Sequence, residues 1–75
     1  SDNSELIIKF KQDFYISMIP VTEDIQGLSM EGFKYPLKDV EVKRGSTLLI
    51  SNQIISSQGI IRLKKGTAIL FISKD

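Results

Sequence analysis

Nearly the same phrase occurs twice in this chain, and the repetition limits the folds available to it. The two segments are "VKRGSTLLIS" at residues 42–51 and "LKKGTAILFIS" at residues 63–73. Each has an aliphatic residue, two cations, a glycine and a small hydroxyl residue ahead of a run of apolar side chains. Glycine supplies the positive φ of a tight turn, and the apolar run that follows suits a buried strand. We interpret both copies as strand, glycine turn and strand.

The side-chain composition favours β-structure along the whole chain. The 75 residues include 12 isoleucines, three valines and three threonines, but one alanine. Branched side chains lose rotamer freedom in a helix and pack well on a pleated sheet. Apolar residues also alternate with period two in "ELIIKFK" (5–11) and "DFYISMI" (13–19), as half-buried strands require. The predicted fold class is mainly β: a single small barrel or a rolled antiparallel sheet with one or two short helical turns.

The residues that begin, end or connect these strands give the finer predictions. Pro20 should end a strand because it cannot donate to a ladder. Segment 22–27 should form one helical turn, capped by Thr22 and stopped by Gly27. Segment 52–58 is either a short helix, with Ser51 or Asn52 as its cap, or a strand. The "KQD" at 11–13 either turns a hairpin or bends one long strand.

The same alternation predicts which side chains are buried. The expected core residues are Leu6, Ile8, Phe10, Ile16, Leu48, Ile50, Ile61, Leu70 and Ile72.

Length and composition predict one small domain over residues 1–75, with residues 1–4 as a flexible N-terminus. A domain of this size buries only about 60% of the surface that its unfolded chain exposes. There is no cysteine and no histidine, so neither a disulfide nor the commonest zinc ligands are available. We expect no metal and no cofactor. A cytoplasmic protein is expected, because neither a signal peptide nor an apolar run of membrane-spanning length is found.

The available side chains argue against an enzyme. Without histidine and cysteine there is no ordinary Ser-His-Asp or Cys-His nucleophile pair. The carboxylate pairs Glu23–Asp24 and Asp39–Glu41 fall in no recognisable motif and are interpreted as solvated surface. "KRGST" and "KKGT" do not match a phosphate-binding loop, in which the glycine precedes the lysine and a helix follows.

Uneven charge suggests binding of nucleic acid as one function. Residues 1–37 carry three cations against six carboxylates, and residues 38–75 carry seven against three. On this hypothesis the basic turns contact phosphates and nearby aromatic rings stack on single-stranded bases. The alternative is that the lysines only solubilise turns and the aromatic rings belong to the core. The candidate nucleic-acid-binding residues are Lys43, Arg44, Arg62, Lys64, Lys65, Phe33, Lys34 and Tyr35.

The last apolar run suggests a protein partner. "AILFI" at 68–72 has apolar side chains on both faces of a predicted strand. Something must cover the second face, either the rest of a closed barrel or a partner chain. We therefore expect a protein partner, and a homo-oligomer is one form that it can take.

Segment 32–61, "GFKYPLKDVEVKRGSTLLISNQIISSQGII", resembles the small β-domain of GINS replication-complex subunits. The order of strand, lysine–glycine turn, aliphatic strand, short helix and glycine is similar, and "LIIKFKQDF" would be the first strand. In that family the domain is non-catalytic and docks other replisome proteins. The resemblance implies a docking or accessory module of a larger assembly, such as a DNA replication complex. Direct binding of single-stranded nucleic acid through the basic turns is the alternative.

Overall fold

The computed structural model describes residues 3–21, 23–45 and 52–74. None of these residues is helical. The chain forms six strands: β1 (Ser4–Lys9), β2 (Phe14–Pro20), β3 (Ile25–Glu31), β4 (Leu37–Val42), β5 (Gln58–Leu63) and β6 (Ala68–Lys74).

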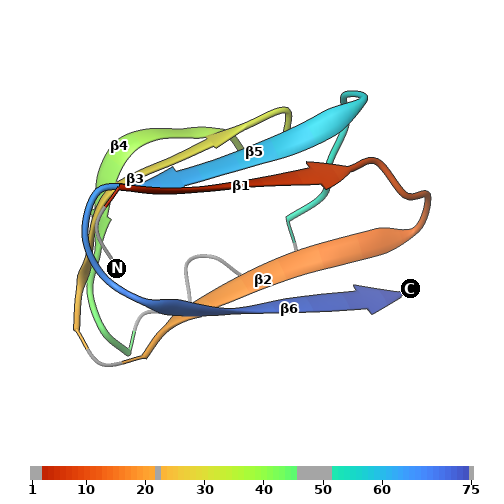
Figure 1. The fold of residues 1–75 in the computed structure, drawn as a ribbon. Coiled ribbons are helices and arrows are strands. Elements are labelled where there is room, and N and C mark those ends of the chain that lie inside the picture. The colour runs from red at the N-terminus through yellow and green to blue at the C-terminus, as the bar shows by residue number, and fades with distance from the viewer. Residues whose placement is uncertain (1–2, 22, 46–51, 75) are drawn as a thin grey trace.

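The strands form two open antiparallel sheets that face each other as layers (Figure 1). The large sheet has the order β1-β5-β3-β4, and the small sheet pairs β2 with β6. The mainly β, antiparallel fold class is confirmed. The closed-barrel alternative is wrong, because the described strands form two separate open sheets, and the helical turns predicted within the described ranges are wrong as well.

Two connections carry the chain from the large sheet to the small one. Segment 10–13 joins β1 to β2, so "KQD" forms neither a hairpin nor a bend in one strand. Segment 64–67 joins β5 to β6 in the same way, within the second copy of the repeated phrase. Gly45 and Gly66 have φ of 86° and 114°, the positive values predicted for both turns. The strand predicted after Gly45 falls on residues 46–51, which lie outside the described ranges.

β3 occupies residues for which a helical turn was predicted. Its inward side chains, Ile25, Leu28 and Met30, are at most 1% exposed. An ideal strand would turn Ile25 and Leu28 to opposite faces, because side chains alternate. Their common orientation comes from a β-bulge, where the register with β4 shifts between Ile25 and Leu28 and Gly27 has φ of 66°. The predicted helical turn is wrong, because Gly27, expected to stop a helix, instead supplies the positive φ of a bulge within β3.

A second bulge on β4 restores the register that the first one shifts. Leu28 faces Val40 and Met30 faces Leu37, so β4 has one residue more than β3 over this step. Asp39, with φ of 50°, lies in this stretch. Its backbone N–H donates to Ser29 Oγ at 3.0 Å. The two bulges therefore compensate each other.

Lys64 lies across both bulges. A Cβ added to Gly27 would lie 2.5–2.8 Å from the first three side-chain carbons of Lys64, so the lysine stem rests directly on this glycine. Its ammonium lies 3.2 Å from Asp39 Oδ1. Lys64 thus covers one bulge with its stem and reaches the other with its charge.

The core lies between the two sheets. Its buried apolar members are Ile16, Met18, Ile25, Leu28, Met30, Phe33, Val42, Ile54 and Ile61. Two predicted core residues, Ile16 and Ile61, are confirmed, and Ile8 and Leu70 pack against the core half-buried.

The prediction was wrong for Leu6, Phe10 and Ile72, which are 46%, 49% and 53% exposed. Leu6 and Ile72 lie on β1 and β6, which are edge strands, and Phe10 follows β1. An edge strand has a neighbouring strand on one side only. Side chains on such a strand can therefore alternate as predicted and still remain exposed to solvent. Leu48 and Ile50 lie outside the described residues.

The segment before β5 and the N-terminus both pair with other parts of the chain. Asn52 and Ile54 form isolated bridges with Ile16 and Phe33. Segment 52–58 is therefore closer to the predicted strand than to the predicted helix. Ser4 begins β1, and the Asn3 N–H donates to the Lys64 carbonyl at 3.0 Å.

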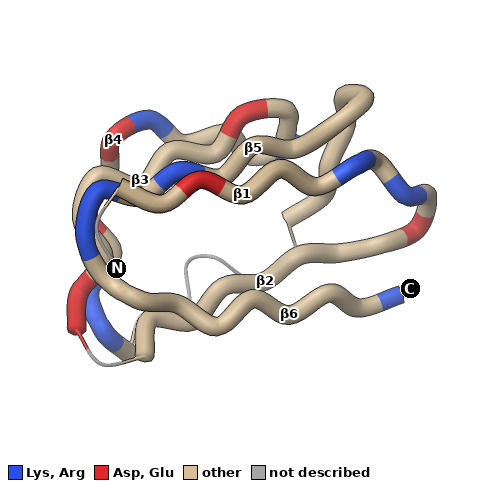
Figure 2. The backbone as a smooth tube through the Cα atoms, viewed as in Figure 1, with Lys and Arg blue, Asp and Glu red and all other residues tan. Residues whose placement is uncertain are grey.

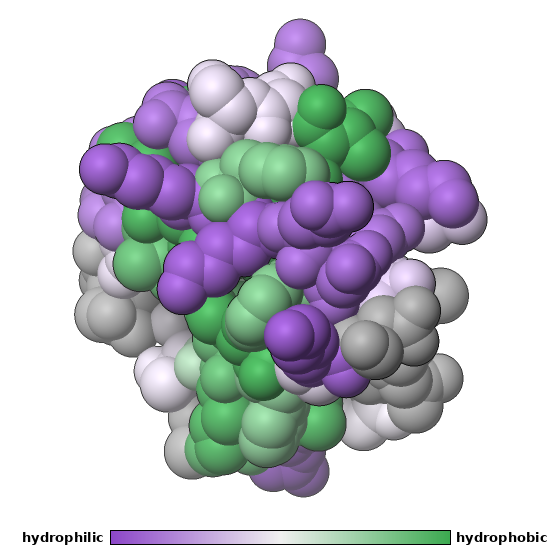
Figure 3. All heavy atoms as spheres, turned by 90° about the vertical axis from the view of Figure 1, so that its right-hand side faces the viewer, coloured by the Kyte–Doolittle hydropathy of each residue, from purple (hydrophilic) through white to green (hydrophobic). Residues whose placement is uncertain are grey.

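The outer face of the small sheet is apolar. Ile69 and Phe71 on β6 are each 49% exposed, and Ile19 on β2 is 45% exposed. In Figure 3, hydrophobic residues gather in the lower part of the view, where β2 and β6 lie. The apolar second face predicted for 68–72 is present, and none of the described residues covers it fully.

Truncation of Leu28 to alanine should lower the free energy of unfolding by about 2–5 kcal/mol, because it leaves a cavity at the centre of the core. Leu6→Ala is the matched control, since the same change is made where the side chain is 46% exposed. Its cost should be less than half as large. Urea denaturation followed by circular dichroism measures both, and equal costs would contradict this core.

Gly27→Ala should destabilise the fold through two separable effects: the strain of a Cβ at positive φ and its overlap with the Lys64 stem. Lys64→Ala removes Cγ and Cδ, the two carbons that would lie closest to the new Cβ at 2.6 and 2.5 Å, and leaves the Lys64 Cβ at 2.8 Å. In that background the cost of Gly27→Ala should therefore fall by about 1 kcal/mol in a double-mutant cycle. Gly45→Ala is the control, because Gly45 also has positive φ but no atom lies within 4 Å of an added Cβ. Strict additivity for Gly27 and Lys64 would show that the stem does not pack on the bulge.

Candidate functional site

Four of the predicted nucleic-acid contacts come together at one end of the sandwich, where β3 begins. The Arg44 N–H donates to Asp24 Oδ1 at 2.7 Å, and Lys43 Nζ lies 3.5 Å from Asp24 Oδ2. The turn with Lys64 and Lys65 lies at the same end, since the Lys65 N–H donates to the Gln26 carbonyl at 3.1 Å. Figure 2 shows acidic and basic segments next to each other at this left-hand end. The basic turns meet as predicted, but carboxylates lie among them.

Asp24 is the acceptor that ties the turn after β4 to β3. The backbone N–H of Arg44, followed by the charge of Lys43, lowers the pKa of Asp24 despite partial desolvation. The nearby carboxylates of Glu41 and Asp24 raise the pKa of Lys43. Both groups are thus held in their charged forms at neutral pH.

Arg62 lies on the outer face of the large sheet between two carboxylates. Its Nε lies 2.7 Å from Glu5 Oε2 on β1, and its Nη1 lies 2.9 Å from Glu31 Oε1 on β3. The hydrogen bonds to these two groups raise the pKa of Arg62. Arg62 links β1, β5 and β3 across the sheet, and a phosphate would have to replace these partners.

The predicted aromatic contacts lie at the other end of β3, away from the basic turns. Phe33 is 2% exposed and belongs to the core, whereas Tyr35 is 60% exposed. Phe33 thus follows the alternative in which the ring belongs to the core, whereas Tyr35 does not. The Lys34 ammonium lies 5.5 Å from the centroid of the Tyr35 ring. Tyr35 is thus an exposed ring next to a cation, separate from the other predicted cations.

Tyr35 is part of a two-segment ribbon in which residues 32–35 pair with residues 52–55. The Lys34 N–H donates to the Gln53 carbonyl at 2.7 Å, and the Ile55 N–H donates to the Gly32 carbonyl at 2.8 Å. We call this pair of segments the ribbon.

Asn52 fixes the backbone of Tyr35 from inside the ribbon. Its side chain, in a residue that is only 6% exposed, accepts from the Tyr35 N–H at 3.1 Å and donates to the Tyr35 carbonyl at 3.0 Å. Its backbone exchanges hydrogen bonds of 2.7 and 2.9 Å with Ile16 on β2. Asn52 therefore ties the exposed tyrosine to the small sheet. From the sequence, Asn52 was expected only as a helix cap. Its position next to the apolar residues at 54–55 was the one signal for a buried role.

An exposed aromatic ring on a fixed backbone can bind a flat heteroaromatic ring by stacking or a cation through its face. The Lys34 ammonium already lies near the Tyr35 ring, so a cation fits there. Within the described ranges, no three His, Cys, Asp or Glu side chains gather as a metal site. No helix long and apolar enough to cross a membrane occurs in the same residues.

Known proteins resemble this chain in both sequence and fold. Residues 5–68 match the family described as "Thiamin pyrophosphokinase, vitamin B1 binding domain". The thiamine pyrophosphokinase of Bacillus subtilis (strain 168) is 49% identical over 61 residues, which cover 81% of this chain and 28% of that protein.

Solved structures give the same relationship. The crystal structure of thiamine pyrophosphokinase from Bacillus subtilis covers the whole chain with a TM-score of 0.93 and 42% identity, using 36% of its own length. The thiamin pyrophosphokinase of Geobacillus thermodenitrificans covers 99% of the chain with a TM-score of 0.82 and 33% identity, using 34% of its length. This chain therefore spans about a third of these relatives.

These relatives overturn three expectations. The resemblance to GINS subunits is wrong, because the matching family and relatives are thiamine pyrophosphokinases. The role as a docking module in DNA replication is wrong for the same reason, and DNA binding gains no support. The expectation of a chain unrelated to enzymes is wrong as well, since the relatives are kinases.

Asp24→Asn should lower stability near neutral pH, and the loss should disappear in acid. The folded protein holds the pKa of Asp24 below its ordinary value, so ionised Asp24 stabilises the fold above the ordinary carboxyl range. That contribution is lost as the pH falls through the lowered pKa. Urea denaturation at about pH 7 and about pH 2 should show it.

Glu23→Gln is the control for this effect. Glu23 is the neighbouring carboxylate, it is exposed, and it forms no ion pair with another described residue. Its replacement should change stability little at either pH. An equal loss for Asp24→Asn at both pH values would show that the charge of Asp24 contributes nothing.

Proposed function

This chain belongs to the thiamin pyrophosphokinase vitamin B1 binding domain family, and we propose that it binds thiamine within a thiamine pyrophosphokinase. The family match over residues 5–68 carries the proposal. The name of the relatives states the transfer of a pyrophosphoryl group to thiamine. Because the chain spans only about a third of their length, we propose that activity for the protein that carries this chain. Binding of the vitamin is the part that we assign to these residues.

The ribbon is the surface whose chemistry suits this ligand best. Thiamine joins a flat aminopyrimidine ring to a cationic thiazolium ring. Tyr35 offers an exposed aromatic face, which can stack on the first ring or attract the charge of the second. Two other aromatic side chains are half-exposed among the described residues: Phe10, directly after β1, and Phe71, on the outer face of the small sheet.

Asn52 makes this face a fixed one. Its bonds to both backbone groups of Tyr35 hold the aromatic residue in place before a ligand arrives. A preorganised contact loses less conformational entropy on binding. We therefore assign Tyr35 as a ligand contact and Asn52 as the residue that positions it.

The remaining expectations about location and partners are separate from this assignment. A cytoplasmic location, a protein partner and a homo-oligomer stay predictions.

Lys34 has a place in the proposal, because its ammonium lies over the Tyr35 ring and would be displaced by the thiazolium cation.

Isothermal titration of the chain with thiamine tests the proposal directly. We expect saturable binding, and Tyr35→Ala should weaken it about 5- to 30-fold, the loss of an aromatic contact with a cation or ring. Tyr35→Phe keeps the ring and should stay within about threefold of the original affinity. In the protein that carries the chain, Tyr35→Ala should raise the KM for thiamine in a pyrophosphoryl-transfer assay.

Phe71→Ala is the matched control, since it removes another half-exposed aromatic ring, which lies on the outer face of the small sheet and outside the ribbon. It should leave thiamine affinity unchanged. Absence of thiamine binding together with absence of transfer activity would overturn the function. Normal binding by Tyr35→Ala would overturn the site alone.

A further inference from the structure

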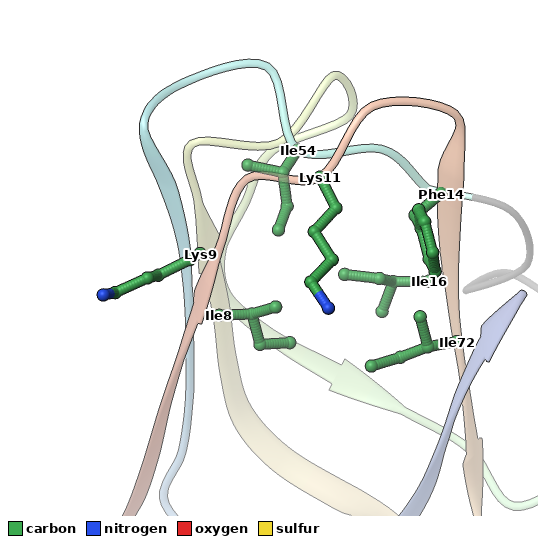
Figure 4. A pocket seen from close by; sticks show the side chains of 7 residues that line it. All are labelled: Ile8, Lys9, Lys11, Phe14, Ile16, Ile54 and Ile72. Carbon is green, nitrogen blue, oxygen red and sulfur yellow. The ribbon is translucent and has the colours of Figure 1, made fainter. Parts of the chain in front are cut away.

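An apolar pocket opens between the two sheets below the ribbon. Its volume is about 150 Å³, and its apolar walls come from Ile8 on β1, Phe14 and Ile16 on β2, Ile72 on β6, and Ile54 of the ribbon (Figure 4). A cavity of about this size in a protein core can hold a molecule as large as benzene. The pocket therefore has room for one small apolar group.

The connection between β1 and β2 adds a charge to this pocket. The Lys11 side chain points into it, whereas the Lys9 side chain, which also borders it, points away (Figure 4). The Lys11 ammonium lies 5.6 Å from the centroid of the Phe14 ring. It forms no ion pair with a carboxylate of any described residue.

A second cation stands on the same face of the small sheet. Across the β2–β6 pair, Ile16 faces Ile72 and Phe14 faces Lys74. Because residues two apart on a strand share a face, Lys74 lies on the pocket side of β6, next to Ile72. No carboxylate occurs among the residues that line the pocket. Its charge is therefore positive.

We propose that this pocket binds a small monocarboxylate with an apolar body about the size of a benzene ring. The aliphatic and aromatic walls would bury the body, and the Lys11 ammonium would donate hydrogen bonds to the carboxylate. A carboxylate next to this ammonium can accept charge-assisted hydrogen bonds from it. This ligand and this pocket are separate from thiamine binding at Tyr35.

A second recess between the sheets can be compared with this pocket to show that the Lys11 cation determines the class of ligand. It has a volume of about 130 Å³ and is also mainly apolar, with Met18, Ile61 and Leu70 in its walls. The charged residue on its rim is Glu5, whose carboxylate is paired with Arg62. No cation is among the residues that line this recess, so it is the internal comparison for the proposal.

Benzoate is the probe, and the isoleucine methyl signals of the chain report its position in ¹³C-edited NMR titrations. Saturable shifts at Ile8, Ile54 and Ile72 are expected, with a Kd on the order of 1 mM, reasonable for so small a ligand. Lys11→Met should weaken binding about tenfold or more, because it removes the charged donor while keeping the length of the stem. Lys11→Arg should retain most of the affinity, and Lys9→Met, the matched control, should leave it unchanged.

The charge requirement has its own test. Benzyl alcohol has the same ring and no charge, so it should bind at least tenfold more weakly than benzoate. Equal binding of the two, or unchanged benzoate binding by Lys11→Met, would overturn the proposed class of ligand. Absence of saturable shifts at the pocket isoleucines would overturn the site. Folding of each variant is checked in the same spectra, and Lys11→Gln, which also removes the charge, replaces Lys11→Met as the test if the latter is not folded.

Discussion

The fold depends on the burial of Ile25, Leu28 and Met30 along a single face of β3. Ideal strand geometry would expose one of them, and two compensating bulges prevent this while the pairing with β4 survives. Each such side chain stabilises a core by about 1.5–3 kcal/mol when fully buried. Since a small domain has a total stability of about 5–15 kcal/mol, exposing one of the three would remove a large part of it. The positive φ of 50° at Asp39 is the backbone strain that this burial outweighs, whereas Gly27 adopts its positive φ without a Cβ penalty.

The order of the strands also determines where the charges lie. The first half of the sequence is acidic and the second half is basic, yet the large sheet alternates between them in the order β1-β5-β3-β4. Arg62 on β5 therefore lies between Glu5 on β1 and Glu31 on β3. Charge that is segregated along the sequence becomes mixed in space. This is the physical reason why clustering of cations in the sequence did not produce an unpaired basic surface.

Sequence reasoning succeeded where the signal was local. Alternation predicted β1 and β2, Pro20 ends β2, and both repeated glycines have positive φ. It failed for β3, because Gly27 was interpreted as a helix stop and not as part of a bulge, and for edge strands, because burial depends on what lies opposite. Within the candidate site, Tyr35 was predicted as a binding residue only because it is aromatic. The role of Asn52 was not, since its side-chain partner lies 17 residues away and only the paired ribbon brings them together.

The two ends of the sandwich differ in the partners of their cations. We use this difference to distinguish cations that stabilise the fold from cations that are available to a ligand. At the end where β3 begins, Lys43 and Lys64 pair with carboxylates that fix turns and bulges. At the opposite end, Lys11 and Lys34 lie over the aromatic rings of Phe14 and Tyr35 at 5.6 and 5.5 Å. An exposed cation–π contact contributes about 0.5–1 kcal/mol, so it can be exchanged for a ligand without loss of the fold. Breaking the pairs at the first end would loosen the bulges on which the core depends, so we place ligand binding at the second.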